Sequence, residues 1–387
     1  MKIKFISIIT ILLSLWSCNQ SRTKEITYSN PLSVSFGDPY ILAASDGRYY
    51  MYGTSGEKGF RAYSSDDLTD WKEEGLVYQG GTDQSWNVDC FWAPEVYERG
   101  GKYYLWYSAN WKQNPTNEEE NFRIGVAVAD KPTGPFKDLN DGPVFDPGYP
   151  VIDANLLFDD KTGKVYLYYS RCCYKHPVES EIASLAKEKG WYDEIEESWI
   201  YGVELKPDYS GIIGEPKVML CPPASLDDKQ AEWESRSVTS QEANRRWTEG
   251  SFIFERNGLY YMMYSANFFG GADYAVGYAT SESPLGPFKK SDHNPVLQKY
   301  PSSRRSIPPS PLPTARSRRP ILSWGSALWR RSPTPSPQRI PSGSRPAASW
   351  GQRSLWWNIR PEKRKGLPIP FTAPAIPWTR PAWPLSG

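Results

Sequence analysis

The stretch from Arg245 to Asn267 reads RRWTEGSFIFERNGLYYMMYSAN and carries the pattern of a β-hairpin. Its turn is Asn257-Gly258, a pair that favours the positive φ angles of a tight hairpin turn. The run after the turn, LYYMMYS, is aromatic and apolar and has the length of one strand. The run before the turn, SFIF, follows Glu249. A lone carboxylate therefore stands at the entrance of a hairpin that is otherwise apolar, and Glu249 is a candidate functional residue.

The same pattern occurs four times along the chain. Aligned on the turn glycine, the copies are DGRYYMYGT at 46–54, GGKYYLWYSAN at 100–110, TGKVYLYYSR at 162–171 and NGLYYMMYSAN at 257–267. A short strand pattern precedes each copy and holds an acidic residue at what we interpret as the same relative position, namely Asp38, Glu95, Asp153 and Glu249. A third element follows three of the copies, and IYGVELKPDYSGIIGEP is the candidate in the third repeat. Each repeat predicts a meander of about four strands.

Repeats of this kind cannot bury a core alone, so they must stack on one another. Radial stacking into a β-propeller leaves only short strand edges, and we therefore predict an all-β propeller. The spacing of the repeats is irregular, which indicates insertions. The largest insertion runs from Cys172 to Trp199 and includes EIASLAKEKG, a candidate short helix at the surface. A second, charged insertion, SLDDKQAEWESRSVTSQEANRR, leads up to Glu249.

Charge and composition divide the chain near Tyr300. Residues 301–387 hold 13 Arg, 2 Lys and one acid, a net charge of +14, whereas residues 1–300 carry −13. The tail also holds 18 of the 35 Pro and no Tyr. The acidic folded part argues against nucleic-acid binding. With two His in the chain and no metal-ligand spacing among the Cys, a His-rich metal site is excluded.

The N-terminus has the pattern of a targeting segment. Lys2 and Lys4 precede the apolar run FISIITILLSLW, which is too short to span a bilayer. The sequence LWSC, ending at Cys18, resembles a bacterial lipobox. We expect residues 1–18 to be a lipoprotein-type signal peptide with lipidation at Cys18, and residues 19–30 to be a polar tether. An ordinary cleaved signal with an incidental Cys is the alternative. The chain is then exported and anchored in the outer leaflet of a membrane, either periplasmic or at the cell surface.

In a propeller, the first strand of each blade lines the central channel. Asp38, Asp153 and Glu249 are therefore expected around its mouth, where like charges push pKa values apart so that one carboxyl stays protonated while another acts as a base. Two such carboxylates about 6.5–9.5 Å apart would hydrolyse a glycosidic bond with inversion. Trp92 is a candidate sugar platform, whereas Glu95 is expected to make structural hydrogen bonds.

Each carboxylate also has a structural explanation. Asp38 precedes Pro39 and is in a position typical of a turn residue. Asp153 could cap the entry of its strand. Glu249 could form an ion pair with Arg245 or Arg246.

The motifs GDPYIL, WAPEV with GGKYYLWYS, IDANLLFDDKTGKVYLYYS and TEGSFIFERNGLYYMMYS resemble the successive blades of family 43 glycoside hydrolases. The resemblance covers about 38–300. It implies a five-bladed β-propeller that removes arabinofuranosyl or xylosyl units from plant-type polysaccharides or oligosaccharides with inversion. It places the general base at Asp38, the general acid at Glu249, and a residue that tunes pKa and orients substrate at Asp153. A fructan-cleaving enzyme of the same clan is the rival, but SFGDPYIL lacks the Asn-Asp pair of that enzyme's nucleophile motif.

The family pattern also implies a fifth blade that begins with a Gly-His-rich segment. The chain instead reads YPSSRRSIPPSPLPTARSRRP, so 31–300 is predicted as an incomplete propeller with about four recognisable blades. Residues 301–387 are interpreted as an aberrant, disordered tail read out of frame. A genuine basic, Pro-rich tail is the alternative. No cofactor is expected, because a channel calcium known in relatives would depend on the missing blade. A noncatalytic carbohydrate-binding propeller, or an inactive truncated enzyme, is the second function considered.

Overall fold

Strand pairing gives a five-stranded, a four-stranded and a nine-stranded sheet in the described residues, and these contain four antiparallel meanders of four strands, which we number as blades one to four. The computed structural model describes residue 32 and residues 34–115, 120–175, 180–298 and 356–358. Blades one and two contain β1 (Gly37–Ala43), β2 (Tyr49–Thr54), β3 (Gly59–Ser65), β4 (Lys72–Gln79), β5 (Trp92–Arg99), β6 (Lys102–Asn110), β7 (Phe122–Ala129) and β8 (Lys137–Asp138). Blades three and four contain β9 (Val151–Asp159), β10 (Lys164–Tyr174), β11 (Glu196–Leu205), β12 (Ile212–Leu220), β13 (Arg245–Arg256), β14 (Leu259–Asn267), β15 (Ala275–Ser281) and β16 (Lys289–Lys290).

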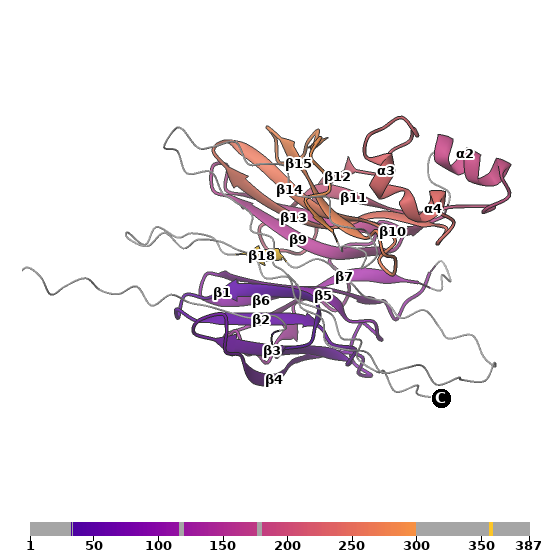
Figure 1. Cartoon of the computed structure of the whole chain (residues 1–387). Helices are drawn as coiled ribbons and strands as arrows, with labels where there is room; N and C mark the ends of the chain where they lie inside the picture. Colours follow the sequence, from indigo (N-terminus) through magenta and orange to yellow (C-terminus); the bar gives the residue numbers. More distant parts are fainter. Residues whose placement is uncertain (1–31, 33, 116–119, 176–179, 299–355, 359–387) are drawn as a thin grey trace, which may run out of the picture.

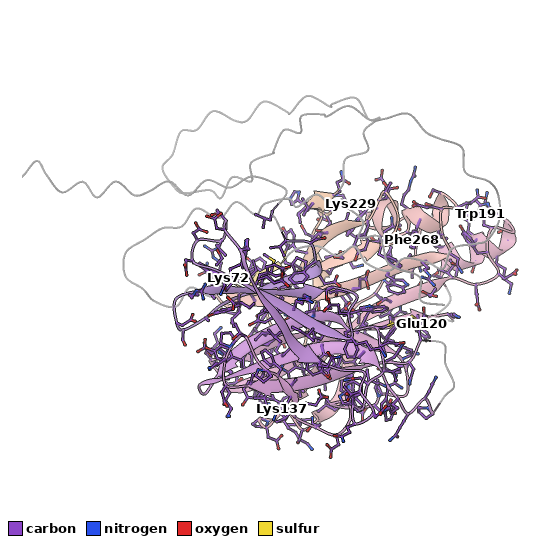
Figure 2. All side chains as sticks on the ribbon, turned by 90° about the horizontal axis from the view of Figure 1, so that it is seen from below. Lys72, Glu120, Lys137, Trp191, Lys229 and Phe268 are labelled. Atoms are coloured by element: carbon purple, nitrogen blue, oxygen red, sulfur yellow. The ribbon has the colours of Figure 1, made fainter. Side chains whose placement is uncertain are left out.

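The first strands of successive blades lie side by side. β1 contacts β5, β5 contacts β9, and β9 contacts β13, so these four strands form the inner wall of the molecule. Blades one and two lie on one side of Figure 1 and blades three and four on the other. Charged side chains such as Lys72, Lys137 and Lys229 project from the outside of the molecule (Figure 2). The all-β prediction and the four-strand meander, including β11 and β12 in the third repeat, are confirmed.

The hairpin turns between the first two strands follow the sequence pattern. Gly47, Gly101, Gly163 and Gly258 all have φ between +70° and +89°, the left-handed region that glycine enters without steric cost. In blade four Asn257 is also left-handed, with φ +56°, as a type I′ turn requires. The turn glycine is therefore a requirement of backbone geometry in each repeat.

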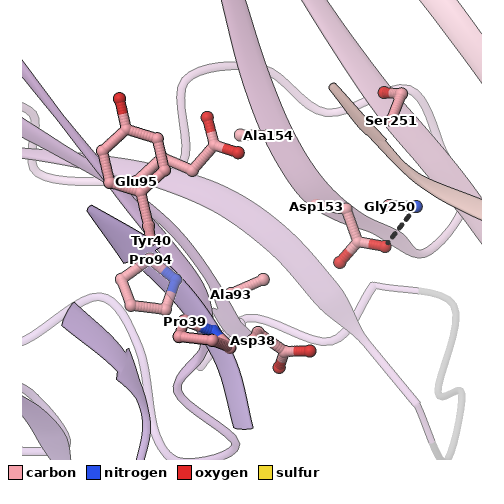
Figure 3. Close-up of a pocket in the computed structure, with 10 residues that line it drawn as sticks. All are labelled: Asp38, Pro39, Tyr40, Ala93, Pro94, Glu95, Asp153, Ala154, Gly250 and Ser251. Atoms are coloured by element: carbon pink, nitrogen blue, oxygen red, sulfur yellow. Dashed lines mark hydrogen bonds between the residues drawn. The ribbon is translucent and has the colours of Figure 1, made fainter. Parts of the chain in front are cut away.

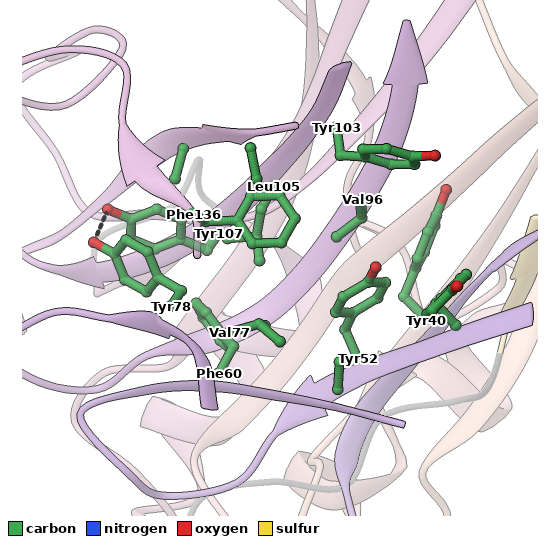
Figure 4. Close-up of a cluster of buried hydrophobic side chains, with 14 of the residues drawn as sticks. Tyr40, Tyr52, Phe60, Val77, Tyr78, Val96, Tyr103, Leu105, Tyr107 and Phe136 are labelled. Atoms are coloured by element: carbon green, nitrogen blue, oxygen red, sulfur yellow. Dashed lines mark hydrogen bonds between the residues drawn. The ribbon is translucent and has the colours of Figure 1, made fainter. Parts of the chain in front are cut away.

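The aromatic strands form cores between neighbouring blades. Tyr52 of blade one and Tyr107 of blade two are fully buried and belong to one cluster (Figure 4). The ring of Tyr107 lies 4.9 Å from that of Tyr78, and their hydroxyl oxygens are 2.6 Å apart. Tyr168 and Tyr264 are buried together between blades three and four. Burying aromatic side chains of this size is the main stabilisation that stacking provides, and the prediction that the tyrosine strands are core packing is confirmed.

Blades three and four are also joined edge to edge by a short parallel bridge. Residues 196–198 of β11 pair with residues 245–247 of β13, which places Glu196 opposite Arg245 and Glu197 opposite Arg246. Arg246 Nη2 lies 2.5 Å from Glu197 Oε1, and both side chains are at most 2% exposed. Removing one partner of such a buried pair leaves an uncompensated charge and costs about 3–5 kcal/mol.

The two insertions form helices. The first insertion contains α2 (Glu181–Glu188), and the Ser180 side chain caps this predicted helix by accepting a hydrogen bond from Ala183 N. The second insertion forms α3 (Ala231–Glu234) and α4 (Arg236–Thr239). Despite its charged composition it is partly a core element, because Glu234 is fully buried and lies 2.5 Å from Lys290 Nζ.

Two further short strands complete the described structure. β17 (Leu297–Gln298) pairs with β15, and β18 (Trp356–Asn358) pairs in parallel with β1. The rest of 301–387 lies outside the described residues, as do the proposed signal segment 1–18 and tether 19–30. The tail interpretation and the lipidation of Cys18 therefore stay predictions. None of the helices in the described residues is long and apolar enough to cross a membrane.

Candidate active site

Every inner strand carries a bulge at the same point. In each blade two residues of the first strand face one residue of the second. In blade one, Gly37 pairs with Thr54 and Tyr40 pairs with Tyr52, so the two residues between Gly37 and Tyr40 face a single residue of β2. The two-residue bulges are Asp38-Pro39, Ala93-Pro94, Asp153-Ala154 and Gly250-Ser251. The first residue of each bulge is left-handed, with φ values of +48°, +47°, +66° and +57° in that order. The bulges therefore place the equivalent residues Asp38, Ala93, Asp153 and Gly250 around one pocket.

This register corrects the assumption that the four acidic residues share one position. Asp38 and Asp153 are the first residues of their bulges, whereas Glu249 stands one residue before its bulge and Glu95 immediately follows its bulge. The residue of blade two that matches Glu249 is Trp92. The sequence alignment missed this because it counted from the turn glycine, and the hairpins differ in length between bulge and turn.

A pocket lies between the bulges. It is lined by the bulge residues of all four blades together with Tyr40 and Glu95 (Figure 3). Asp38 and Asp153 both border it. The structure thus brings the two aspartates predicted from sequence to one cavity, with the backbone of the residue after Glu249 in its wall.

Asp38 lies on β1 and is partly exposed. The hydroxyl of Thr54 on β2 donates to its Oδ2 at 2.7 Å. Non-glycine residues in the left-handed region cost about 1–3 kcal/mol, with Asp among those that tolerate it best. Asp38 is held in this conformation, with its carboxylate bordering the pocket.

Asp153 lies on β9 and is 4% exposed. Its Oδ2 accepts two hydrogen bonds, from the hydroxyl of Ser170 at 3.0 Å and from Gly250 N at 3.2 Å. The second bond is drawn in Figure 3. Because Gly250 follows Glu249, the Asp153 carboxylate fixes the peptide next to Glu249.

Glu249 lies on β13 and is 2% exposed. The hydroxyl of Tyr274 donates to its Oε1 at 2.7 Å. Burial raises the pKa of Glu249 from 4.5 to about 8; the Tyr274 hydrogen bond and the charge of Arg245 lower this pKa, while the negative charge of Asp38 raises it. Glu249 therefore keeps its proton at neutral pH. The electrostatic interaction with Asp38 also links the two carboxyl groups directly.

An ion pair with Arg245 or Arg246 was the structural explanation offered for Glu249. Arg245 forms its ion pair with Glu196 at 3.0 Å, and Arg246 pairs with Glu197. At Glu249 the hydrogen-bond donor is Tyr274. The ion pairs of the two arginines therefore join β11 to β13. Glu249 is a buried carboxyl whose pKa is raised in part by the negative charge of Asp38.

Glu95 has the structural role expected of it. Its Oε2 accepts hydrogen bonds from the hydroxyl of Tyr97 and from Asn155 Nδ2, the latter at 2.9 Å. Asn155 Oδ1 in turn accepts Ile253 N at 3.0 Å. These bonds tie blades two, three and four together along the channel wall.

Aromatic side chains surround Trp92. Its ring lies 4.4 Å from that of Phe122, and the same cluster includes Phe268, Phe269 and Tyr274 from the segment after β14. Trp92 is only partly buried. The arrangement suits an aromatic platform, and the binding of sugar by Trp92 stays a prediction. The described cysteines, Cys90, Cys172, Cys173 and Cys221, are free thiols.

Metal-binding groups do not gather at the pocket. Among the described residues there is no cluster of three or more His, Cys, Asp or Glu side chains that fits a metal ion. His293, the histidine within the described ranges, is exposed in the turn after β16. No step of the reaction proposed for this site depends on a metal ion.

Sequence reasoning missed three residues that contact the carboxylates: Thr54, Ser170 and Tyr274. Thr54 and Ser170 end the aromatic runs YYMYGT and VYLYYS, so a hydroxyl at the end of each run was a usable signal. Tyr274 carries no such signal, since it lies in a connecting segment 25 residues after Glu249.

Comparison with known proteins gives a consistent result. Residues 28–309 match the model of glycosyl hydrolases family 43. A xylosidase/arabinosidase of Bacteroides ovatus is 28% identical over 235 residues, which are 60% of this chain and 65% of the relative. The matched part thus spans just under two thirds of that relative.

Solved structures agree in fold. The crystal structure of a thermostable family-43 glycoside hydrolase is 34% identical, with a TM-score of 0.58, and the match covers 71% of this chain and 78% of that one. An endo-1,4-beta-xylanase from Bacteroides thetaiotaomicron is 32% identical, with a TM-score of 0.52 and coverage of 68% and 75%. The predicted resemblance and the propeller fold of this five-bladed family are confirmed, with four blades in the described residues. The chain belongs to glycosyl hydrolase family 43.

Proposed function

We propose that this protein hydrolyses the glycosidic bond of arabinofuranosyl or xylosyl units in plant-type polysaccharides or oligosaccharides, with inversion at the anomeric carbon. The observation that carries the proposal is the pair formed by Glu249 and Asp38. One is a buried carboxyl with a pKa raised to about 8, and the other is a carboxylate on the pocket whose charge contributes to that shift. A protonated and an ionised carboxyl are what acid and base catalysis at one glycosidic bond require.

Glu249 acts as the general acid. Tyr274 donates to Oε1, so the proton of Glu249 resides on Oε2 and is available to the leaving oxygen. As the bond from C1 to the glycosidic oxygen breaks, that oxygen takes the proton and leaves as an alcohol. Burial disfavours the charged form of Glu249, which raises its pKa to about 8 and keeps the carboxyl protonated at neutral pH until the leaving oxygen takes the proton.

Asp38 acts as the general base. It removes a proton from a water molecule whose oxygen bonds to C1 from the face opposite the leaving group. Thr54 holds Oδ2 of Asp38, which fixes the direction of the carboxylate. Asp153 orients the substrate and, through Gly250, the acid residue; its contribution to the pKa of Glu249 stays part of the proposal.

Two features support a furanosyl or xylosyl sugar. Trp92 occupies in blade two the register position that Glu249 occupies in blade four, and it belongs to the same aromatic cluster as Tyr274, whose hydroxyl donates to Glu249. The relatives named above are described as a xylosidase/arabinosidase and an endo-1,4-beta-xylanase. We propose action on terminal units, with internal cleavage as the alternative.

The test uses the full chain with 4-nitrophenyl arabinofuranoside, xyloside and galactoside. We expect release of nitrophenol from the first or second, and proton NMR of the earliest product should show the anomer opposite to that of the substrate. A retained anomer would refute inversion. Oligosaccharides of increasing length then distinguish removal of single units from internal cleavage. Saturable sugar binding without turnover would identify a noncatalytic carbohydrate-binding propeller.

We further propose that the protein is exported and anchored by acylation of Cys18. The support is the basic and apolar segment that precedes LWSC. Expression with a labelled fatty acid in a bacterial host should label the wild type and leave Cys18→Ser unlabelled and released from membranes. Equal labelling of the two proteins would refute the lipid anchor.

A further inference from the structure

A hydroxyl side chain stands at the same position on the second strand of every described blade. It faces the residue that precedes the bulge, and the four positions are Thr54, Ser108, Ser170 and Ser265. The three serines are fully buried and Thr54 is partly buried. A buried hydroxyl needs an acceptor for its hydrogen and donors for its lone pairs.

Three of these hydroxyls accept a hydrogen bond from the following blade. The donor is in each case the backbone N–H of the first bulge residue: Ala93 N to Thr54 Oγ1 at 3.0 Å, Asp153 N to Ser108 Oγ at 3.0 Å, and Gly250 N to Ser170 Oγ at 3.1 Å. One bond of this kind therefore joins each consecutive pair of described blades next to the pocket.

Two of the hydroxyls also donate to a carboxylate of their own blade. Thr54 donates to Asp38 Oδ2 at 2.7 Å, and Ser170 donates to Asp153 Oδ2 at 3.0 Å. Each hydroxyl has one hydrogen, which it donates to the carboxylate of its own blade. Its oxygen accepts the N–H of the next blade, and this second bond fixes the orientation of the hydroxyl. Ser108 makes the same bond between blades without a carboxylate, because its own bulge begins with Ala93.

Blade four shows a longer version of the same connection. Ser265 is hydrogen-bonded to Tyr274, and the hydroxyl of Tyr274 donates to Glu249. A hydroxyl at this position thus reaches the carboxyl of every described blade that carries one of the three candidate catalytic acids.

From this pattern we propose that Thr54 and Ser170 are positioning residues. Each sets the direction of one carboxylate relative to the neighbouring blade, Thr54 for Asp38 and Ser170 for Asp153, so that stacking of the blades aligns the reacting groups. The inference deepens the proposed function and rests on it for its catalytic consequence. The hydrogen-bonded coupling itself can be measured without turnover.

The first experiment is a double-mutant cycle by thermal unfolding of the full chain. Thr54→Val keeps the shape of the side chain and removes the hydroxyl. Its loss of Tm should be at least about 2 °C smaller in an Asp38→Ala background than in the wild type, because the carboxylate partner is already gone. Ser108→Ala is the matched control, which loses only the bond between blades, and its effect should add to that of Asp38→Ala within about 1 °C. Additive effects of Thr54→Val would overturn the proposal.

The second experiment is kinetic. Thr54→Val should lower kcat about tenfold with KM within about twofold of the wild type, since the base is misdirected while sugar binding persists. Thr54→Ser, which keeps the hydroxyl, should restore most of kcat. A purely structural role predicts instead that Thr54→Val yields less folded protein without a change in kcat per folded molecule.

The outcomes separate this inference from the proposed function. A wild type without turnover on any sugar refutes the proposed function, while the unfolding cycle still decides whether the hydroxyl is coupled to the carboxylate. A wild type with turnover and an unchanged kcat in Thr54→Val refutes positioning alone. If Thr54→Val does not fold, Ser170→Ala combined with Asp153→Ala gives the same cycle in blade three.

Discussion

Blades two and four share one backbone and differ in what it carries. Both inner strands have a bulge whose first residue is left-handed, Ala93 in one and Gly250 in the other. Before the bulge, blade two has Trp92 and blade four has Glu249. The carboxylate of blade two, Glu95, lies after the bulge and is hydrogen-bonded by Tyr97 and Asn155.

The position of a carboxyl relative to the bulge of its strand therefore decides its surroundings. Glu249 at the mouth is buried, protonated and close enough to Asp38 for their charges to interact. Glu95, three residues further along its strand, finds donors in the channel wall. Substitutions at the two positions should therefore differ in their effect on turnover.

The largest effect is expected for Asp38→Ala, which extends the comparison to blade one. Turnover should fall by about 10³-fold or more on every substrate, activated or not, because no leaving group replaces the attacking water. Azide is small enough to enter the vacated space and attack C1, and the product identifies the mechanism. A glycosyl azide of inverted configuration supports Asp38 as base, whereas a covalent glycosyl-enzyme trapped in the wild type would make Asp38 a nucleophile.

Glu249→Gln should have the next largest effect, and the effect should depend on the leaving group. Turnover of natural oligosaccharides should fall about 10²–10³-fold, because their alcohols must be protonated to leave. Nitrophenyl glycosides need less protonation and should lose much less. Steady-state kinetics on both substrate types measure the difference. Equal losses on the two would exclude Glu249 as the acid.

The raised pKa of Glu249 predicts two pH effects. The ratio kcat/KM should fall as pH rises through about 8, since the acid loses its proton there. Between pH 4.5 and about 8 the folded protein binds a proton that the unfolded chain does not, so the free energy of unfolding falls as pH rises. Above pH 8, Glu249→Gln should therefore be more stable than the wild type, by an amount on the order of a few kcal/mol. Parallel stability curves for the two proteins would contradict the shift.

Trp92→Ala tests the position that matches Glu249. KM for arabinosides or xylosides should rise about tenfold through loss of the aromatic face, with a smaller change in kcat. Trp92→Phe keeps a ring and should recover most of the affinity. An unchanged KM for Trp92→Ala would remove this residue from the sugar site.

The smallest kinetic effect is expected for Glu95→Gln, the counterpart of the acid variant. Kinetic constants should stay within about threefold of the wild type, because Glu95 is committed to the channel wall. The glutamine amide cannot accept both hydrogen bonds at one oxygen as well as a carboxylate does, so Tm should fall by an amount that corresponds to about 1–2 kcal/mol. A loss of activity comparable to that of Glu249→Gln would break the comparison.

Much of this protein could be read from local sequence. The turn glycines and the alternating aromatic runs predict the four hairpins, because hairpin geometry depends on neighbouring residues. The candidate acids were found as well, since a carboxylate next to an apolar run is visible without a structure. The helix at Glu181–Glu188 follows from its own composition and its Ser180 cap.

Register and contacts between blades could not be read in this way. The bulges place Glu249 opposite Ser265 and make Trp92 its equivalent, although spacing from the turn glycine suggested a match with Asp38. A bulge adds one residue to one strand and so changes which residues of the two strands face each other, and the sequence of a single strand does not show how it pairs with its partner.

Local sequence was sufficient to predict the strands and their repetition, because these depend on interactions within a few residues, and it also pointed to the candidate acids. Which groups come into contact depends on the packing of the blades. Tyr274 reaches Glu249, Gly250 reaches Asp153 across 97 positions, and the charges of Asp38 and Glu249 interact across the mouth. The reason is physical: burial raises the pKa of Glu249, and burial arises only when the blades stack and exclude water from the inner strands.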